Sequence, residues 1–245
     1  MKDQHSKNNL RSRNWEHPDI YKYEETIALK IPGYHTMYDM LERLLAAQCG
    51  NQSSTNVLII GAGGGQEIIT AGARHKNWHF TGIDPSKRML EIASRRIEEA
   101  GLQQQVTLLQ TGLDGFPPQG PYDAATCMLV LHFVKEREQK QQLLAQIADH
   151  LKPGAPFFLA SINGAVGSES WSHMMKAWQS HMLDQGISNT DWQKFEDSIG
   201  VNSHPLPSEE VELLLQKAGF STISRYFGSY LVDAWFAFKN DRGNV

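Results

Sequence analysis

A short stretch between positions 61 and 84 carries the residue types and spacing of a nucleotide-binding loop. Glycines stand at positions 61, 63, 64 and 65, where a backbone without Cβ atoms can turn tightly and let a ligand approach closely. Asp84 closes the stretch. A carboxylate at the end of a strand can accept both hydroxyls of a ribose, while the glycine turn holds the neighbouring part of the cofactor. The stretch therefore indicates a site for a nucleoside cofactor.

The segments around these glycines predict one β–α–β unit. Residues 57–60 are apolar, mostly β-branched and too few for a helix, which favours a buried parallel strand. Residues 67–73 predict a helix, and residues 78–83 predict a second strand that ends on Asp84. The dinucleotide pattern G-x-G-x-x-G would need glycine at position 66, where the chain has Gln66. This argues against an NAD(P)-dependent oxidoreductase.

The pattern Gly61-x-Gly63-x-Gly65 resembles motif I of the class I S-adenosylmethionine (SAM)-dependent methyltransferases. Three further segments resemble this family in their order and spacing; they are Asp84-Pro85-Ser86, Tyr122-Asp123-Ala124 and Leu151-Lys152-Pro153-Gly154. The resemblance covers residues 30–240 or so. It implies an α/β fold with a doubly wound, mostly parallel seven-stranded sheet, with SAM as methyl donor and S-adenosylhomocysteine (SAH) as product.

The same resemblance implies which residues contact the cofactor. They are Tyr34, Gly61, Ala62, Gly63, Gly65, Asp84, Pro85, Leu113, Asp114 and Met128. Two positions depart from the family pattern. Ile59 stands where the family usually has the acid of motif I, and Gly112 stands where an adenine-contacting Asp is usual. Leu113 is then left for apolar contact, with Asp114 as a substitute for that Asp.

The domain organisation follows from composition and apolar periodicity. Residues 1–14 are charged and amide-rich, and we expect a disordered tail. Residues 15–245 are expected to form a single domain. Two helices within residues 18–48 precede the first strand, and by the resemblance they cover the cofactor; equally, they could simply cap the sheet. A helical insertion at residues 165–205, after the fifth strand, resembles the substrate lid of small-molecule methyltransferases.

Candidate acceptor and catalytic residues lie outside the glycine loop. Trp171, Met175 and Trp178 recur at helical spacing in the insertion and could shape an adaptable apolar acceptor pocket, or form the insertion's own small core. His132, after the fourth strand, and His35 are candidates for a general base. The alternative for His132 is a hydrogen-bonded residue beneath the cofactor.

Composition limits the partners. A net charge of −4 over 245 residues gives no electrostatic reason to expect DNA and argues against tRNA. Cys49 and Cys127 make no disulfide framework, and the histidines have no ligand-like spacing, so we expect no metal. No apolar run reaches membrane-spanning length, and the polar N-terminus lacks a signal core. We therefore expect a cytoplasmic protein; a homodimer is compatible with the sequence.

A second, partial resemblance leads to an alternative function. Residues 31–34 (I-P-G-Y) look like the V-P-G-Y of carboxy-SAM synthases of tRNA wobble-uridine modification, and residues 216–220 (Q-K-A-G-F) look like their H-K-A-G-F. Those enzymes hold the extra carboxylate with an arginine, and here Lys194 is the cation within residues 192–204. The leading prediction is therefore methyl transfer to a small-molecule acceptor. The alternatives are a carboxy-SAM-synthase-like enzyme or a SAM-binding protein without catalysis, which Ile59 and Gly112 suggest.

Overall fold

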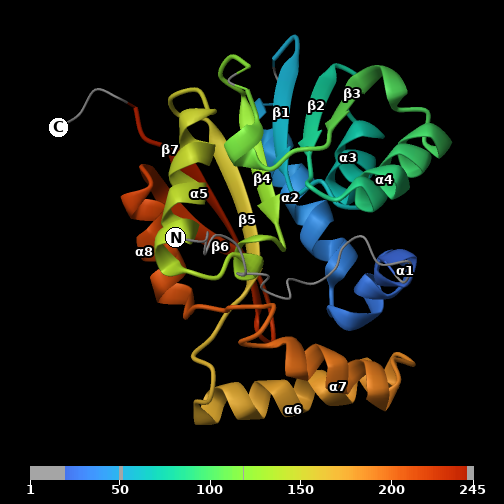
Figure 1. The fold of residues 1–245 in the computed structure, drawn as a ribbon. Helices are drawn as coiled ribbons and strands as arrows, with labels where there is room; N and C mark the ends of the chain where they lie inside the picture. Colours follow the sequence, from blue (N-terminus) through green and yellow to red (C-terminus); the bar gives the residue numbers. More distant parts are fainter. Residues whose placement is uncertain (1–19, 50–51, 118, 242–245) are drawn as a thin grey trace, which may run out of the picture.

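The computed structural model describes residues 20–49, 52–117 and 119–241, and it centres on one seven-stranded sheet (Figure 1). The predicted tail at residues 1–14 lies outside the described residues. The strand order is β3-β2-β1-β4-β5-β7-β6, and β7 runs antiparallel to both of its neighbours. The strands are β1 Thr55–Ile60, β2 Trp78–Ile83, β3 Val106–Leu109, β4 Ala124–Met128, β5 Pro156–Ile162, β6 Phe220–Ser229 and β7 Val232–Lys239. The predicted doubly wound, mostly parallel seven-stranded sheet is thus confirmed.

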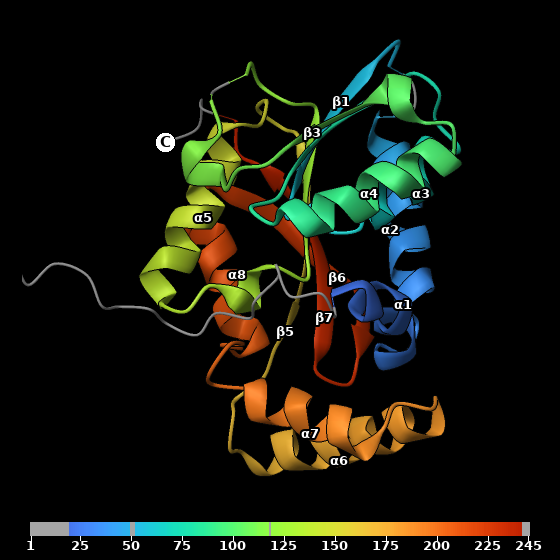
Figure 2. The ribbon, with the colours of Figure 1, turned by 45° about the vertical axis from the view of Figure 1, so that its right-hand side comes forward.

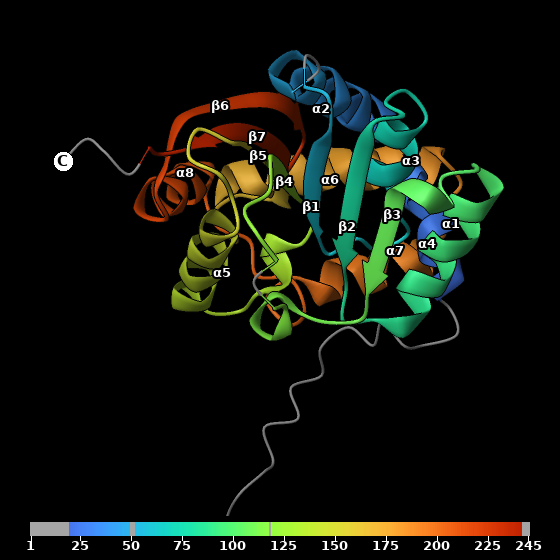
Figure 3. The ribbon, with the colours of Figure 1, turned by 90° about the horizontal axis from the view of Figure 1, so that it is seen from above.

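Helices cover both faces of the sheet. They are α1 Ile20–Lys30, α2 Tyr34–Cys49, α3 Gln66–Gly72, α4 Lys87–Glu99, α5 Arg137–Asp149, α6 Glu169–Asp184, α7 Asn189–Ser198 and α8 Ser208–Lys217. Figure 2 shows α2, α3 and α4 on one side of the sheet and α5 and α8 on the other. Seen from above, the strands fan out between these two layers (Figure 3). The pair α6–α7 lies apart from both layers, beyond the carboxyl ends of the parallel strands (Figures 1 and 2).

Successive side chains of each strand point to opposite faces of the sheet, and this divides the core into two clusters. Val57 and Ile59 of β1 belong to the cluster beneath α2, α3 and α4, whereas Leu58 and Ile60 belong to the cluster beneath α5 and α8. All four side chains are at most 4% exposed. A strand buried on both faces needs apolar residues at every position, because successive side chains point to opposite faces. This explains the unbroken apolar run from 57 to 60.

Residues 122–124 and 151–154, two of the segments that resemble the methyltransferase family, meet at the amino ends of β1 and β4. Their hydrogen bonds form a clamp around Asp123. The carboxylate of Asp123 accepts hydrogen bonds from the backbone N–H of Asn56 at 2.8 Å and from Nζ of Lys152 at 2.6 Å. Burial acts to raise the pKa of Asp123, but the bonds from Lys152 and Asn56 outweigh it and hold that pKa below its usual value. The clamp fixes the register of the strands that carry the site.

Three predictions from local sequence are wrong. Pro85 has the residue type of a first helical turn, but Ser86 is the N-cap of α4, and its Oγ accepts from the Met89 N–H at 3.2 Å. Ser208, followed by two glutamates, has the residue type of an N-cap, but it does not cap α8, and its hydroxyl donates to Asp233 at 2.6 Å. Residues 123–130 predict the fourth strand, but the strand ends at Met128, because Leu129 has a φ of +61°, outside the extended region.

Candidate functional site

A pocket opens at the carboxyl ends of β1, β2 and β4. Its floor is the loop of residues 61–64, and residues 84–85 and 128–130 form its two flanks. Tyr34 and Tyr38 of α2 also line it. In an open α/β sheet this edge, where helices on the two faces diverge, is the usual place for a ligand.

The glycine loop adopts a backbone conformation that residues with a Cβ atom would disfavour. Gly61 has a φ of +70°, and a Cβ added there would lie 2.3 Å from Cγ2 of Val130. Gly63 has a φ of +50° and also lines the pocket. Positive φ is costly for residues with a Cβ, by roughly 1–2 kcal/mol. The glycines therefore allow β1 to turn sharply and expose backbone atoms to a ligand.

Asp84 sits at the end of β2 with its carboxylate held in place. One oxygen accepts from the N–H of Gly63 at 2.9 Å, and the other accepts from the N–H of Ser86 at 2.8 Å. The residue is 9% exposed and lines the pocket. A carboxylate oxygen has more than one lone pair, so each can still accept a hydrogen bond from a ligand hydroxyl.

The segment after β4 forms the apolar flank of the pocket. Leu129, at positive φ, and Val130 lead into a 3₁₀ turn, Leu131–Phe133. The buried Lys140 holds this turn: its Nζ donates to the carbonyls of Leu131 at 2.7 Å and of Val134 at 2.5 Å. Burial lowers the pKa of Lys140 to about 8. Leu129, Val130 and Phe133 all line the pocket.

The two predicted base candidates lie in different surroundings. His132 is 4% exposed, and its Nδ1 accepts from the backbone N–H of Ile162 at 3.2 Å, which places a proton on Nε2 of the neutral ring. His35 is exposed on α2, and its ring meets the edge of Tyr34. Neither residue lines the pocket. A catalytic role for either stays a prediction.

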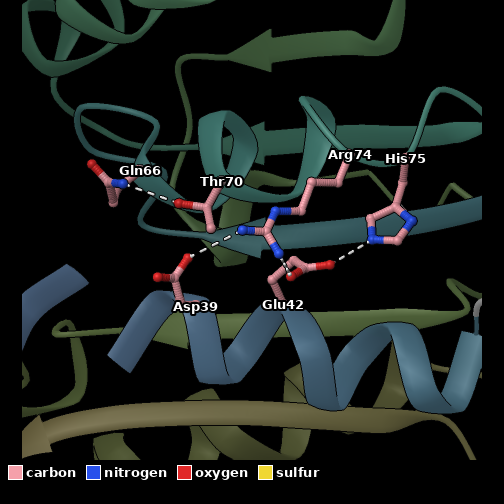
Figure 4. Close-up of polar contacts among 6 residues, drawn as sticks. All are labelled: Asp39, Glu42, Gln66, Thr70, Arg74 and His75. Atoms are coloured by element: carbon pink, nitrogen blue, oxygen red, sulfur yellow. Dashed lines mark hydrogen bonds and ion pairs between the residues drawn. The ribbon is translucent and has the colours of Figure 1, made fainter. Parts of the chain in front are cut away.

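A polar cluster fixes α2 against α3 and so positions the two tyrosines (Figure 4). Glu42, which is 3% exposed, accepts from Arg74 at 3.0 Å and lies 2.7 Å from Nε2 of His75. The His75 ring stacks on Trp78, with centroids 4.0 Å apart. Asp39 adds a weaker ion pair with Arg74 at 3.9 Å. In the same view, Gln66 donates to Thr70, one turn further along α3, at 3.0 Å.

The predicted acceptor residues lie on the inner face of α6. Trp171, Met175 and Trp178 are 7%, 6% and 1% exposed and join the core cluster beneath α2 and α3. The indole N–H of Trp178 donates to the carbonyl of Lys30 at 2.6 Å, which joins α6 to the end of α1. None of the three lines the pocket. Their contact with an acceptor stays a prediction.

The structure brings together most of the predicted cofactor residues. Tyr34, Gly61, Ala62, Gly63, Asp84, Pro85 and Met128 line the one pocket, and Gly65 starts α3 just behind it. Leu113 is 8% exposed in the other core cluster, and the exposed Asp114 accepts from Gln146 at 2.8 Å. Tyr38 and Glu67 also line the pocket and were not among the predicted contacts. Tyr38 follows Tyr34 by one helical turn, a spacing that signals a shared face.

The donor set fits SAM. A carboxylate at the end of β2 suits a ribose, and glycines whose missing Cβ atoms leave the floor open suit a ligand lying against the backbone. No group of three or more His, Cys, Asp or Glu side chains among the described residues is placed to hold a metal ion. Across the same residues, no helix has the length and apolarity that crossing a bilayer requires.

Comparison with known proteins independently supports a SAM-dependent methyltransferase. Residues 58–157 match the family model described as a methyltransferase domain. Ubiquinone biosynthesis O-methyltransferase of Escherichia coli O7:K1 is 24% identical over 172 residues, which cover 68% of this chain and 69% of that protein. The same-named protein of Azoarcus sp. is 30% identical over 115 residues, 47% of each chain. The structure of magnesium protoporphyrin IX methyltransferase from Synechocystis with bound SAH superposes with a TM-score of 0.67 at 16% identity, covering 92% of this chain and 96% of that one.

Proposed function

Since the chain belongs to the class I SAM-dependent methyltransferases, we propose that it methylates a small, partly apolar acceptor at the carboxyl end of β4. The observation that carries this proposal is the composition of the pocket flank beyond the cofactor loop. Leu129, Val130 and Phe133 form it, and Tyr34 and Tyr38 line the same pocket. Aromatic and aliphatic side chains around a few polar groups are typical of a small-molecule site.

SAM supplies an electrophilic methyl group on a sulfonium, so the protein's main tasks are to hold the acceptor and exclude water. A well-oriented pair of reactants gains several kcal/mol of rate acceleration from positioning alone. The rigid turn that Lys140 holds suits this task, because it fixes Phe133 at the pocket. Where the acceptor must lose a proton, His132 and His35 remain the proposed bases.

We assign the role of acceptor lid to the pair α6–α7. The pair lies beyond the carboxyl ends of the strands (Figure 2), on the same side as the pocket. Its lysines are Lys176 and Lys194, and Lys194 forms an exposed ion pair with Asp191 at 3.1 Å. A nucleic acid would need a track of unpaired cations to offset its phosphates. The charge pattern favours a small metabolite.

The names of the relatives also favour a small, partly apolar acceptor. Ubiquinone and magnesium protoporphyrin IX, named in two of the matched proteins, are small molecules with large apolar parts. The comparisons give no support to a carboxy-SAM-synthase-like enzyme or to a SAM-binding protein without catalysis. The cation that the first alternative would use, Lys194, is exposed and paired with Asp191.

The test is methyl transfer from labelled SAM into a cell extract separated into small-metabolite, RNA and protein fractions. The proposal expects label in the small-metabolite fraction, and none when Gly63→Val protein replaces the wild type. Label confined to RNA, with activity lost at a few hundred millimolar salt, would overturn the proposal. Label in no fraction, with SAH binding intact, would favour a binding protein without catalysis.

A further inference from the structure

The glycine loop packs against one face of α4. A Cβ added at Gly63 would lie 3.3 Å from Cε of Met89, and one added at Gly65 would lie 3.3 Å from Cβ of Ala93. Arg96 follows Ala93 by three residues on the same helix, and residues at this spacing share a helix face. One face of α4 thus presents three side chains to the loop, and the last of them is charged.

Arg96 binds the loop through its guanidinium group. Its Nη1 donates to the carbonyl oxygen of Gly64 at 2.7 Å, and its Nη2 donates to Oε1 of Gln66 at 2.8 Å. The two bonds come from one planar group, so they fix the Gly64 carbonyl relative to the first residue of α3. Gln66 is also held from its other end, since its Nε2 donates to Thr70 at 3.0 Å. A chain of hydrogen bonds therefore runs from α4 through the loop into α3.

The peptide group between Gly64 and Gly65 is fixed at both of its ends. The carbonyl accepts from Arg96, and the N–H of Gly65 donates to the carbonyl of Ala62 at 2.8 Å. Glycine adopts either sign of φ readily, so a loop with several glycines needs contacts from outside to keep one conformation. Gly64 and Gln66 line the pocket, whereas Arg96 lies behind it. A bond made behind the pocket thus sets the shape of the pocket floor.

We propose that Arg96 is a positioning residue for cofactor binding, whose guanidinium keeps the Gly64 carbonyl and Gln66 in the arrangement that receives SAM. The inference rests on SAM as the cofactor and is independent of the acceptor. A site that is formed in only part of the molecules has an affinity reduced by that fraction. Loss of the guanidinium should therefore weaken cofactor binding, although Arg96 itself is not part of the pocket lining.

Titration calorimetry with SAH compares the wild type with Arg96→Met and Arg95→Met. Arg96→Met should bind SAH roughly 10- to 30-fold more weakly, because the bonds from a charged donor that hold the loop are lost. Arg95→Met is the matched control, since Arg95 is the neighbouring residue of α4, and its exposed side chain pairs with Glu99 at 4.0 Å. It should bind SAH as the wild type does. Arg96→Lys keeps the charge without the planar two-nitrogen contact and should restore part of the affinity.

Two further measurements separate positioning of the loop from a general loss of stability. Urea unfolding gives the stability of each unliganded variant; a purely structural role would lower it and leave the SAH affinity of the folded protein unchanged. Amide hydrogen exchange by NMR gives the state of the loop, and the Gly65 N–H should exchange faster in Arg96→Met but not in Arg95→Met. Arg96→Lys carries the same comparison if Arg96→Met does not fold.

The proposal is overturned if folded Arg96→Met binds SAH with the wild-type affinity, or if Arg95→Met loses as much affinity. Unchanged exchange of the Gly65 N–H in Arg96→Met would also overturn it. Failure of the wild type to bind SAH is a different outcome, because it would refute the cofactor on which the proposal rests.

Discussion

The carboxylate of Asp84 and the backbone N–H of Gly63 are joined by a hydrogen bond of 2.9 Å. The bond links the end of β2 to the middle of the glycine loop, so the two cofactor-binding segments hold each other in place. Ser86 adds a second backbone donor to the same carboxylate. The site is therefore organised before the cofactor arrives, which lowers the entropic cost of binding.

Loss of this carboxylate should weaken binding of SAH. Asp84→Ala removes a charged acceptor for the ribose hydroxyls and also releases Gly63. We expect a loss of about 2–3 kcal/mol, roughly 30- to 150-fold in affinity, by titration calorimetry. Glu91→Ala removes an equal charge from an exposed position on α4 and should bind as the wild type does. Unchanged affinity in Asp84→Ala would refute the ribose contact.

A side chain at Gly63 should abolish SAH binding and leave the fold intact. Gly63→Val places a branched side chain on the pocket floor, at a φ of +50°. Gly101→Val is the matched control: its φ is +68°, and a Cβ there meets nothing within 4 Å. Both variants carry a similar backbone strain, about 1–2 kcal/mol. Equal loss of affinity in the two variants would show that strain rather than occupation of the pocket is responsible.

The buried Lys140 predicts a pH-dependent stability. Its pKa is about 8 in the folded protein and about 10.4 in an unfolded chain. Between these values the unfolded state binds more protons, so the contribution of Lys140 to the unfolding free energy increases as pH rises. Below pH 8 both states are protonated and the cost of burying the charge is complete.

Urea unfolding of wild type and Lys140→Met at several pH values between 7 and 10 tests this sign. The wild type should gain stability relative to the variant as pH rises, by up to about 1.4 kcal/mol per pH unit. The comparison cancels groups that titrate in both proteins, including the two buried cysteines. A difference that does not change with pH would contradict burial of a titrating amine.

The cluster beneath α2 predicts unequal effects of two acid-to-amide changes. Glu42→Gln removes a buried charge that pairs with Arg74 and His75, and should lower the unfolding free energy by about 1–3 kcal/mol. Asp39→Asn removes an exposed partner of the same arginine, 53% exposed, and should change it by less than about 1 kcal/mol. Equal effects in urea unfolding would contradict the geometry in Figure 4.

Local sequence signals predicted most of the fold. Residues 78–83 and 106–109 predict the second and third strands, and the structure gives both strands these bounds. Short apolar runs flanked by turn residues leave few alternatives. The helix starts were less accurate. Ser208 has the residue type of an N-cap, but a partner 25 residues away, Asp233, takes its hydroxyl. Such a competition cannot be read from local sequence.

The candidate site was predictable where it is continuous in sequence. The loop 61–65 and Asp84 follow one another within a single β–α–β unit, so pattern and spacing suffice. Glu67 could not be placed at the pocket from sequence alone. Its placement depends on how α3 packs against α2, α4 and β2. For His132, the bond from Ile162 depends on how the 3₁₀ turn after β4 meets the end of β5, 30 residues further along the chain.

The bond between Trp178 and Lys30 has a consequence for the evolution of acceptor choice. It spans 148 residues of sequence and joins the insertion to the segment before β1. An insertion transplanted from another member of the family would leave the Lys30 carbonyl without this donor, at a cost of about 1–3 kcal/mol if it stays buried. Exchange of α6 and α7 alone should therefore lower the stability of the protein. The insertion that contains α6 and the segment that contains Lys30 are expected to diverge together, as a single unit of inheritance built from two distant stretches of the chain.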